Sequence, residues 1–201
     1  MGLSIHLKGQ LRSMAQLTAF VDEVEDIANS LEWKSQRVDE VVELEDDTEL
    51  PETQTDKGIR IRGIHITPPE CETLCLTFAP SGKLMSIFGV FSAKMYPEFD
   101  FVYWLHTKTQ FAGVEAHIAI ISLLRYLDKK YFQSFEVSDE GEYWETNDTH
   151  LLTQRFEEYT TLIAAVRGAL EKSEIPVNLD DNSLIKKITE IIQKGLKDLD
   201  N

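Results

Sequence analysis

The first 40 residues of this chain resemble a second stretch that lies 100 residues further along. Residues 3–40 and residues 103–140 share six identical positions when one is laid on the other, where ordinary composition predicts about two or three. Both stretches also follow the order of an apolar strand, a polar junction and an amphipathic helix. We therefore expect a strand–helix unit that is used twice. A true duplication and two similar units with coincidental matches both explain this pattern.

The helices of the two units are predicted from the spacing of their apolar residues. Over residues 14–31 and residues 114–131, apolar side chains recur at every third or fourth position, which is typical of an amphipathic helix. Between the units, alternating isoleucines predict a strand over residues 59–66 with an irregularity at Gly63. Two apolar runs around a Pro–Ser–Gly turn predict a hairpin over residues 70–90.

Together these elements predict an α+β fold with a mixed or mostly antiparallel sheet of six to eight strands and both unit helices on one face. We expect this α+β domain to cover residues 1–146, with repeats at about 3–90 and 99–146. Two further amphipathic helices are expected within residues 147–201 and packed on the domain. The apolar stripe of the last helix could also pair with a second copy of the chain as a homo-oligomer.

The charge of the chain excludes several classes of partner. A formal net charge of −15 opposes binding to nucleic acid and to anionic membranes. The sequence contains no run of apolar residues long enough to span a membrane and no signal peptide. Cys71 and Cys75 share one face of a predicted strand, too far apart for an easy disulfide. We therefore expect a cytoplasmic protein, with neither a cofactor nor a metal.

The second unit contains the densest group of polar and aromatic side chains. His106, Lys108 and Gln110 alternate along an extended segment, so they share one face just before a helix start that could attract an anion. The glycine patterns that bind phosphates are absent from the sequence. His117 lies on the core side of the following helix, where the first unit has Leu17. It is either a hydrogen-bonded core residue or part of a site.

The acidic segment after residue 138 is the other candidate region. Its flanking residues predict a tight hairpin around Asp139-Glu140-Gly141. An exposed Trp or Tyr among carboxylates would be a reasonable anchor for a partner. Asp139 or Glu145 could instead orient a histidine at the pocket of an enzyme or small-molecule binder. The candidate residues of this segment are Asp139, Glu140, Tyr143, Trp144 and Glu145.

Three hypotheses for function follow from these observations, and the third is a structural or homo-oligomeric module that uses the C-terminal helix. The first is a non-enzymatic, acidic protein-binding module, such as an inhibitor or immunity-type protein for a basic protein partner. The second is a small-molecule-binding protein or enzyme, with a pocket between the two units. That pocket would be lined by His106, Lys108, Gln110 and His117. The absence of motifs for nucleophilic or metal chemistry favours the first hypothesis.

Overall fold

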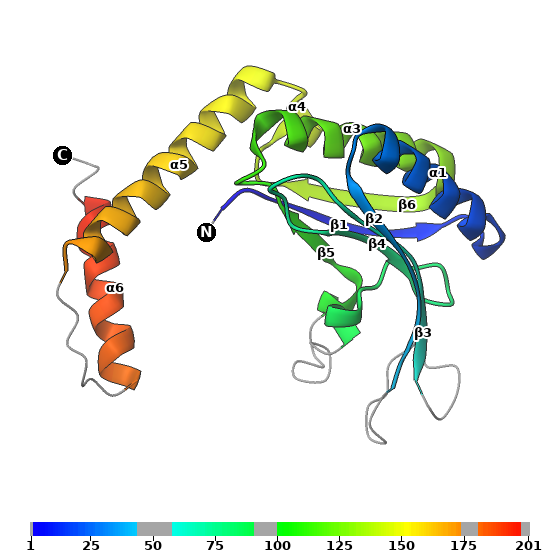
Figure 1. The fold of residues 1–201 in the computed structure, drawn as a ribbon, viewed down its shortest axis with the longest axis horizontal. Helices are drawn as coiled ribbons and strands as arrows, with labels where there is room; N and C mark the ends of the chain where they lie inside the picture. Colours follow the sequence, from blue (N-terminus) through cyan, green and yellow to red (C-terminus); the bar gives the residue numbers. More distant parts are fainter. Residues whose placement is uncertain (1, 44–57, 91–99, 174–180, 198–201) are drawn as a thin grey trace. The chain divides into compact units, whose positions relative to one another are not determined.

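The computed structural model describes residues 2–43, 58–90, 100–173 and 181–197 (Figure 1). The chain divides into two compact units, which comprise residues 2–152 and residues 153–201. The first unit combines helices with two three-stranded antiparallel sheets, so the predicted α+β class is confirmed.

The first sheet is built around the N-terminal strand. Strand β1 (Ser4–Leu11) lies between β5 (Leu105–Lys108) and β6 (Phe132–Asp139) and is antiparallel to both. Successive side chains of a strand point to opposite faces, and β1 alternates strictly between buried and half-buried positions. One face is therefore apolar and packed, whereas the other remains accessible. The accessible face of β1 presents Ser4, His6, Lys8 and Gln10.

The second sheet has the order β2–β3–β4, comprising Lys34–Val42, Ile59–Thr67 and Leu74–Phe78. The predicted irregularity at Gly63 is confirmed, because the buried positions of β3 change face there. Ile59 and Ile61 are buried before Gly63, and Ile64 and Ile66 are buried after it. Gly63 has φ +154°, and an added Cβ would lie 2.2 Å from the Leu76 carbonyl oxygen. Only glycine fits this backbone without strain.

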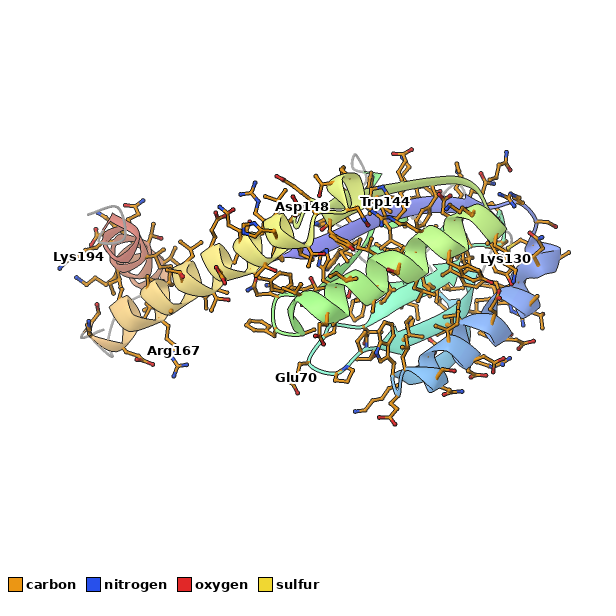
Figure 2. The ribbon with its side chains drawn as sticks, turned by 90° about the horizontal axis from the view of Figure 1, so that it is seen from above. Glu70, Lys130, Trp144, Asp148, Arg167 and Lys194 are labelled. Atoms are coloured by element: carbon orange, nitrogen blue, oxygen red, sulfur yellow. The ribbon has the colours of Figure 1, made fainter. Side chains whose placement is uncertain are left out.

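Helices α1 (Leu17–Ser30) and α3 (Gly113–Tyr131) lie side by side over one face of the sheets, as predicted (Figures 1 and 2). The aromatic ring of Phe20 on α1 packs edge-on against Phe78 and Tyr131, with 5.2 Å between ring centroids in each pair. A short 3₁₀ turn, η1 (Met14–Gln16), precedes α1, and the Ser13 hydroxyl accepts a hydrogen bond from the Ala15 amide. This is the expected role of serine at a helix start.

A polar contact also ties α1 to α3. The Glu23 carboxylate accepts hydrogen bonds from Tyr126 (2.5 Å), from Lys130 (2.6 Å) and from the Tyr131 hydroxyl. Partial burial works to raise the pKa of Glu23, but the hydrogen bonds and the Lys130 charge outweigh it and lower the pKa to about 2.

The turn after β4 links the two sheets and covers part of the opposite face. The Leu84 amide donates to the Gly9 carbonyl (2.8 Å), and the Leu11 amide donates to the Gly82 carbonyl (2.9 Å). A second apolar cluster forms under this turn and under η2 (Asp100–Tyr103). It consists of Val42, Ile59, Ile61, Ala79, Met85, Val90, Val102 and Tyr103. The accessible face of β1 and β5 lies beside this cluster.

Several predictions of detail are wrong. We predicted one sheet, but the structure contains two three-stranded sheets. Residues 84–88 do not form the second strand of a hairpin, and Leu84 makes a single bridge to Phe78. The segment after Asp139 turns into a short helix, α4 (Tyr143–Thr146), and not into a hairpin. The internal duplication is not confirmed. Strands β5 and β6 flank β1 in one sheet, whereas β1 and β2 belong to different sheets.

The two predicted C-terminal helices are present as α5 (Thr149–Glu171) and α6 (Asp181–Lys197). They pass close to each other, since a Cβ added to Gly195 would lie 2.7 Å from the Ala169 Cβ. Among the residues that the structure describes, no helix has the length and apolar character needed to cross a membrane.

Candidate functional site

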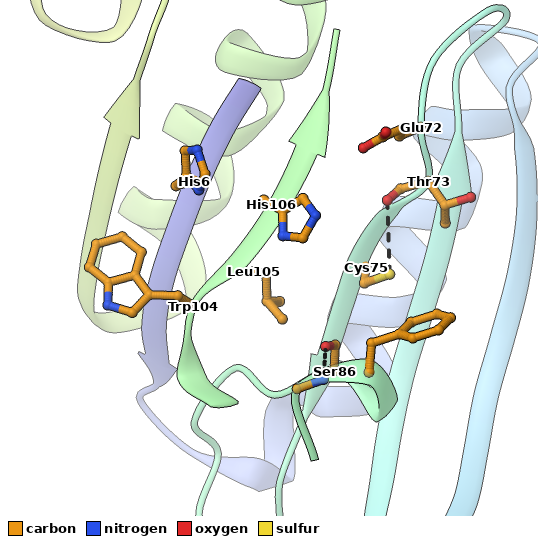
Figure 3. Close-up of a pocket in the computed structure, with 10 residues that line it drawn as sticks. His6, Glu72, Thr73, Cys75, Ser86, Trp104, Leu105 and His106 are labelled. Carbon is orange, nitrogen blue, oxygen red and sulfur yellow. Dashed lines mark hydrogen bonds between the residues drawn. The ribbon is translucent and has the colours of Figure 1, made fainter. Parts of the chain in front are cut away.

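A pocket opens on the accessible face of the first sheet. Cross-strand pairing of β1 with β5 sets His6 directly opposite His106, and their ring centroids are 6.0 Å apart. Both imidazoles point away from α1 and α3, as their alternation with the buried Leu7 and Leu105 requires. Figure 3 shows the two rings beside Trp104, with Glu72, Thr73 and Cys75 across the pocket from them.

The pocket has a volume of about 720 Å³, within the range of small-molecule sites. Its apolar walls come mainly from Trp104 and Phe88, and Phe88 is 80% exposed. Aromatic side chains with this much accessible area are typical contributors to binding. Among the residues that the structure describes, the pocket is lined by His6, Glu72, Thr73, Cys75, Ser86, Phe88, Gly89, Trp104, Leu105 and His106.

The polar rim of the pocket is held in place by hydrogen bonds. Glu72 Oε2 accepts from the Lys108 amide (3.1 Å), Thr73 Oγ1 pairs with Thr67 Oγ1 (2.8 Å), and Ser86 Oγ accepts from the Gly89 amide (2.8 Å). These contacts fix the positions of the rim side chains before any ligand arrives, which reduces the entropy cost of binding.

The thiol at the pocket is a weak nucleophile. Burial raises the pKa of Cys75 to about 11, so the thiol is protonated near neutral pH. Burial also raises the pKa of Cys71, whose Sγ donates to the Lys108 carbonyl oxygen (3.3 Å). These cysteines therefore contribute polarisable surface, not thiolate chemistry.

Of the four residues predicted to line a pocket between the units, His106 alone lies at this one. Gln110 is buried, and its Oε1 accepts a hydrogen bond from the Leu3 amide (3.0 Å). The Lys108 side chain lies against Gly2, just before β1, where an added Cβ would be 2.2 Å from Lys108 Cε. Both residues hold β1 in place beside β5.

His117 belongs to a fully buried polar cluster. Its Nδ1 lies 2.8 Å from Thr109 Oγ1, and its Nε2 lies 3.1 Å from the Asp139 carboxylate. The Asp139 carboxylate also accepts hydrogen bonds from the backbone amides of Gly141 (2.8 Å), Tyr143 (2.8 Å) and Trp144 (3.0 Å). Of the two carboxylates considered as partners for a histidine, Asp139 is the one that contacts His117.

The chemistry of this cluster is structural. A hydroxyl, an imidazole and a carboxylate in series resemble a nucleophile–base–acid arrangement, but the side chains of His117 and Asp139 are 0% exposed, and Thr109 is 0% exposed as a residue. No substrate can reach them. Burial works to raise the pKa of Asp139, but the hydrogen bonds and charge of His117 and the backbone amides outweigh it and lower that pKa. The cluster joins β6, α3 and α4.

The acidic and aromatic segment is mostly engaged with the rest of the domain. Tyr143 is 8% exposed, and Trp144 packs against Phe135 with 6.1 Å between ring centroids. The Arg125 guanidinium lies over both aromatic rings, 5.5 Å from Tyr143 and 5.6 Å from Trp144. The two aromatic side chains therefore serve the fold and do not project as an exposed anchor.

The acids of this segment take different positions. Glu140 Oε2 accepts a hydrogen bond from the Ser4 amide (2.8 Å), and its Oε1 lies 4.0 Å from His6 Nε2. Glu145 is exposed in the first turn of α4. In the described part of the chain, His, Cys, Asp and Glu side chains nowhere gather in a group of three suited to a metal.

The chain matches no protein-family model, and no curated protein or solved structure is significantly similar to it. The pocket therefore has to be interpreted from its own chemistry. Sequence reasoning did not identify His6, Phe88 or Cys75 as pocket residues, because His6 meets His106 only through the pairing of β1 with β5, and Cys75 and Phe88 reach the pocket from other segments of the fold.

Proposed function

We propose that this protein is a binding protein that holds a small organic ligand in the pocket formed by β1, β5 and β4. The observation that carries this proposal is the accessible pocket of about 720 Å³ with aromatic walls and two imidazoles on its floor. A concave, largely apolar site with a few oriented polar groups is the usual form of a ligand site. Trp104 and Phe88 would contact the apolar body of the ligand.

The polar groups at the pocket favour binding over catalysis. The Cys75 thiol is held in its protonated form, and Ser86 and Thr73 are engaged in structural hydrogen bonds. The imidazoles of His6 and His106 can donate or accept hydrogen bonds from a ligand. They would fix its orientation while the aromatic walls supply most of the contact area.

Recognition of a basic protein remains a weaker proposal. It follows from the net charge of −15, but its expected anchors, Tyr143 and Trp144, are turned into the domain and toward Arg125. The pocket has the accessible aromatic surface that the acidic segment lacks.

The proposal is tested by titrating the protein with dansylamide, a neutral aromatic probe whose fluorescence rises in apolar surroundings. Phe88 and Phe111 offer a matched pair, since they are 80% and 69% exposed and Phe88 alone lines the pocket. We expect saturable binding that Phe88→Ala weakens by about fivefold or more and Phe111→Ala leaves within about twofold. Equal effects of the two substitutions, or no saturable binding to the wild type, would overturn the proposal.

A further inference from the structure

We infer that His6 and His106 form a binding site for a divalent transition-metal ion, such as Zn²⁺ or Cu²⁺, on the floor of the pocket. Two observations carry this inference: the two histidines pair across β1 and β5, and both side chains line the pocket. The inference goes beyond the proposed function and does not depend on it, because metal binding is measured without an organic ligand.

Strand pairing fixes the two imidazoles next to each other. His6 and His106 are direct partners in the antiparallel pairing of β1 with β5, and such partners have Cβ atoms about 5 Å apart. Both side chains project toward the pocket, as Figure 3 shows. Their neighbours Leu7 and Leu105 are buried in the core, which holds the two strands in this register.

The separation of the rings suits one bound metal ion. A ring nitrogen lies about 1 Å from the imidazole centroid and about 2 Å from the ion that it ligates, so the ion lies about 3 Å from the centroid. Two imidazoles can therefore share an ion when their centroids are no more than about 6 Å apart. The centroids of His6 and His106 are 6.0 Å apart, and the ring planes are tilted by 37°. Rotation about the side-chain bonds can bring one nitrogen of each ring to the ion.

The ring nitrogens of this pair are accessible for coordination. A metal ion binds the unprotonated nitrogen of an imidazole. Within the part of the chain that the structure describes, no hydrogen bond occupies a ring nitrogen of His6 or His106. His117 differs in both respects, since its two ring nitrogens contact Thr109 and Asp139 and its side chain is fully buried. The pair at the pocket is therefore the better candidate for a metal.

A carboxylate lies beside the two imidazoles. Glu140 Oε1 is 4.0 Å from His6 Nε2, and both side chains are 41% exposed. The other carboxylate oxygen accepts a hydrogen bond from the Ser4 amide (2.8 Å), which holds Glu140 next to the site. A negative charge at this distance stabilises a bound cation, and carboxylates outside the coordination shell commonly orient metal-binding histidines.

The donor atoms select the class of metal. Imidazole nitrogens bind Zn²⁺, Cu²⁺ and Ni²⁺, whereas Mg²⁺ prefers oxygen ligands. The described residues contain no group of three or more ligating side chains that could hold a metal ion, so His6 and His106 supply two ligands. The remaining coordination positions of the ion then face the pocket and accept water or a donor atom of a bound molecule. The sequence-based expectation of no metal rested on local motifs, which cannot show that these two histidines meet.

The test is isothermal titration calorimetry of the tag-free, chelator-treated protein with ZnCl₂ at about pH 7.5, where free imidazole is mostly neutral. Salt at about 0.15 M screens the general attraction of the acidic surface for cations. We expect His6→Ala and His106→Ala each to weaken Zn²⁺ binding by about tenfold or more, because even the loss of a group that only supports a metal ligand costs about 10–100-fold. His150→Ala removes an exposed histidine at the start of α5 and should leave the affinity within about twofold. Circular dichroism confirms that each variant is folded.

A measurement on the wild type keeps the test independent of the variants. In aromatic ¹H–¹³C correlation spectra, about one equivalent of Zn²⁺ per chain should shift or broaden the His6 and His106 signals together. The same concentration of Mg²⁺ should leave all histidine signals in place, since Mg²⁺ does not favour imidazole.

Several outcomes would overturn the inference. One is the absence of saturable Zn²⁺ binding to the wild type. Another is an equal loss of affinity in His150→Ala or in His65→Ala, because His65 pairs with Cys75 across β3 and β4 and would belong to a different site. Binding of Mg²⁺ as tight as that of Zn²⁺ would assign the effect to the net charge of −15. The dansylamide titration, carried out in metal-free buffer, tests the proposed function separately, so either proposal can fail while the other stands.

Discussion

Replacing Asp139 with alanine should destabilise the main unit far more than replacing its partner His117 with leucine. The Asp139 carboxylate is the acceptor for three backbone amides and for the His117 imidazole. Asp139→Ala leaves all four donors without this acceptor, in surroundings where the carboxylate side chain is 0% exposed. His117→Leu removes one of these four donors and the contact between His117 Nδ1 and Thr109 Oγ1, and it leaves the three backbone hydrogen bonds to Asp139 intact.

The magnitudes follow from the cost of unpaired polar groups in a protein interior. A buried donor left without an acceptor costs about 1–3 kcal/mol, and we expect Asp139→Ala to cost about 3–5 kcal/mol because several donors lose their acceptor at once. For His117→Leu we expect about 1–3 kcal/mol, since hydrogen bonds to charged groups contribute about 1.5–3 kcal/mol and leucine recovers some apolar contact. The double variant should cost less than the sum of the two, since the sites are in contact.

Urea unfolding at about pH 7, followed by tryptophan fluorescence, measures these differences. All three tryptophans, Trp33, Trp104 and Trp144, lie in the unit of residues 2–152, so the signal reports on that unit. If His117→Leu proves as destabilising as Asp139→Ala, or more so, the reasoning that the carboxylate is the centre of this cluster is refuted.

Three further predictions address other parts of the fold. The pKa of Glu23 falls from 4.5 to about 2 on folding, so the contribution of Glu23 to stability is present above about pH 4.5 and is lost as the pH falls toward about 2. In urea unfolding measured at several pH values, Glu23→Gln should therefore flatten the loss of stability in acid. An unchanged pH profile would contradict the lowered pKa of Glu23. Gly63→Ala should lower the free energy of unfolding by about 2–4 kcal/mol, because the added Cβ would lie 2.2 Å from the Leu76 carbonyl oxygen. A loss below about 0.5 kcal/mol in thermal unfolding would contradict this steric argument. The pKa of Cys75 is about 11, so iodoacetamide should alkylate this thiol slowly near neutral pH and faster as the pH rises to about 11. Mass spectrometry measures the rate of alkylation. A rapid reaction of Cys75 near neutral pH would refute the raised pKa.

The local elements of this fold could be predicted from the sequence, whereas the pairing of its strands could not. The three- and four-residue spacing of apolar side chains identified α1 and α3, and the break at Gly63 was visible in the shift of the isoleucine pattern. Such patterns depend on near neighbours in the chain. The placement of β1 between β5 and β6 depends on contacts between residues about 100 or more positions apart, which no local pattern contains.

The difference between local patterns and long-range contacts also explains which site residues could be predicted from the sequence. The spacing of apolar residues places His117 on the core side of its helix, and Asp139 and Glu145 were both candidate partners for a histidine. In the structure Asp139 contacts His117. Their complete burial could not be predicted, because it depends on the packing of α4 and β6 around them. The pocket was missed because His6 joins His106 only through strand register.

The most direct test of the proposed function is an aromatic ¹H–¹³C correlation spectrum of the histidine side chains during titration with dansylamide. The chain has five histidines. His6 and His106 line the pocket, His65 pairs with the pocket residue Cys75 across β3 and β4, His117 is buried, and His150 lies at the start of α5. We predict that the His6 and His106 signals shift together along one saturation curve, while those of His117 and His150 stay in place. Stationary His6 and His106 signals at saturating probe would contradict binding in this pocket.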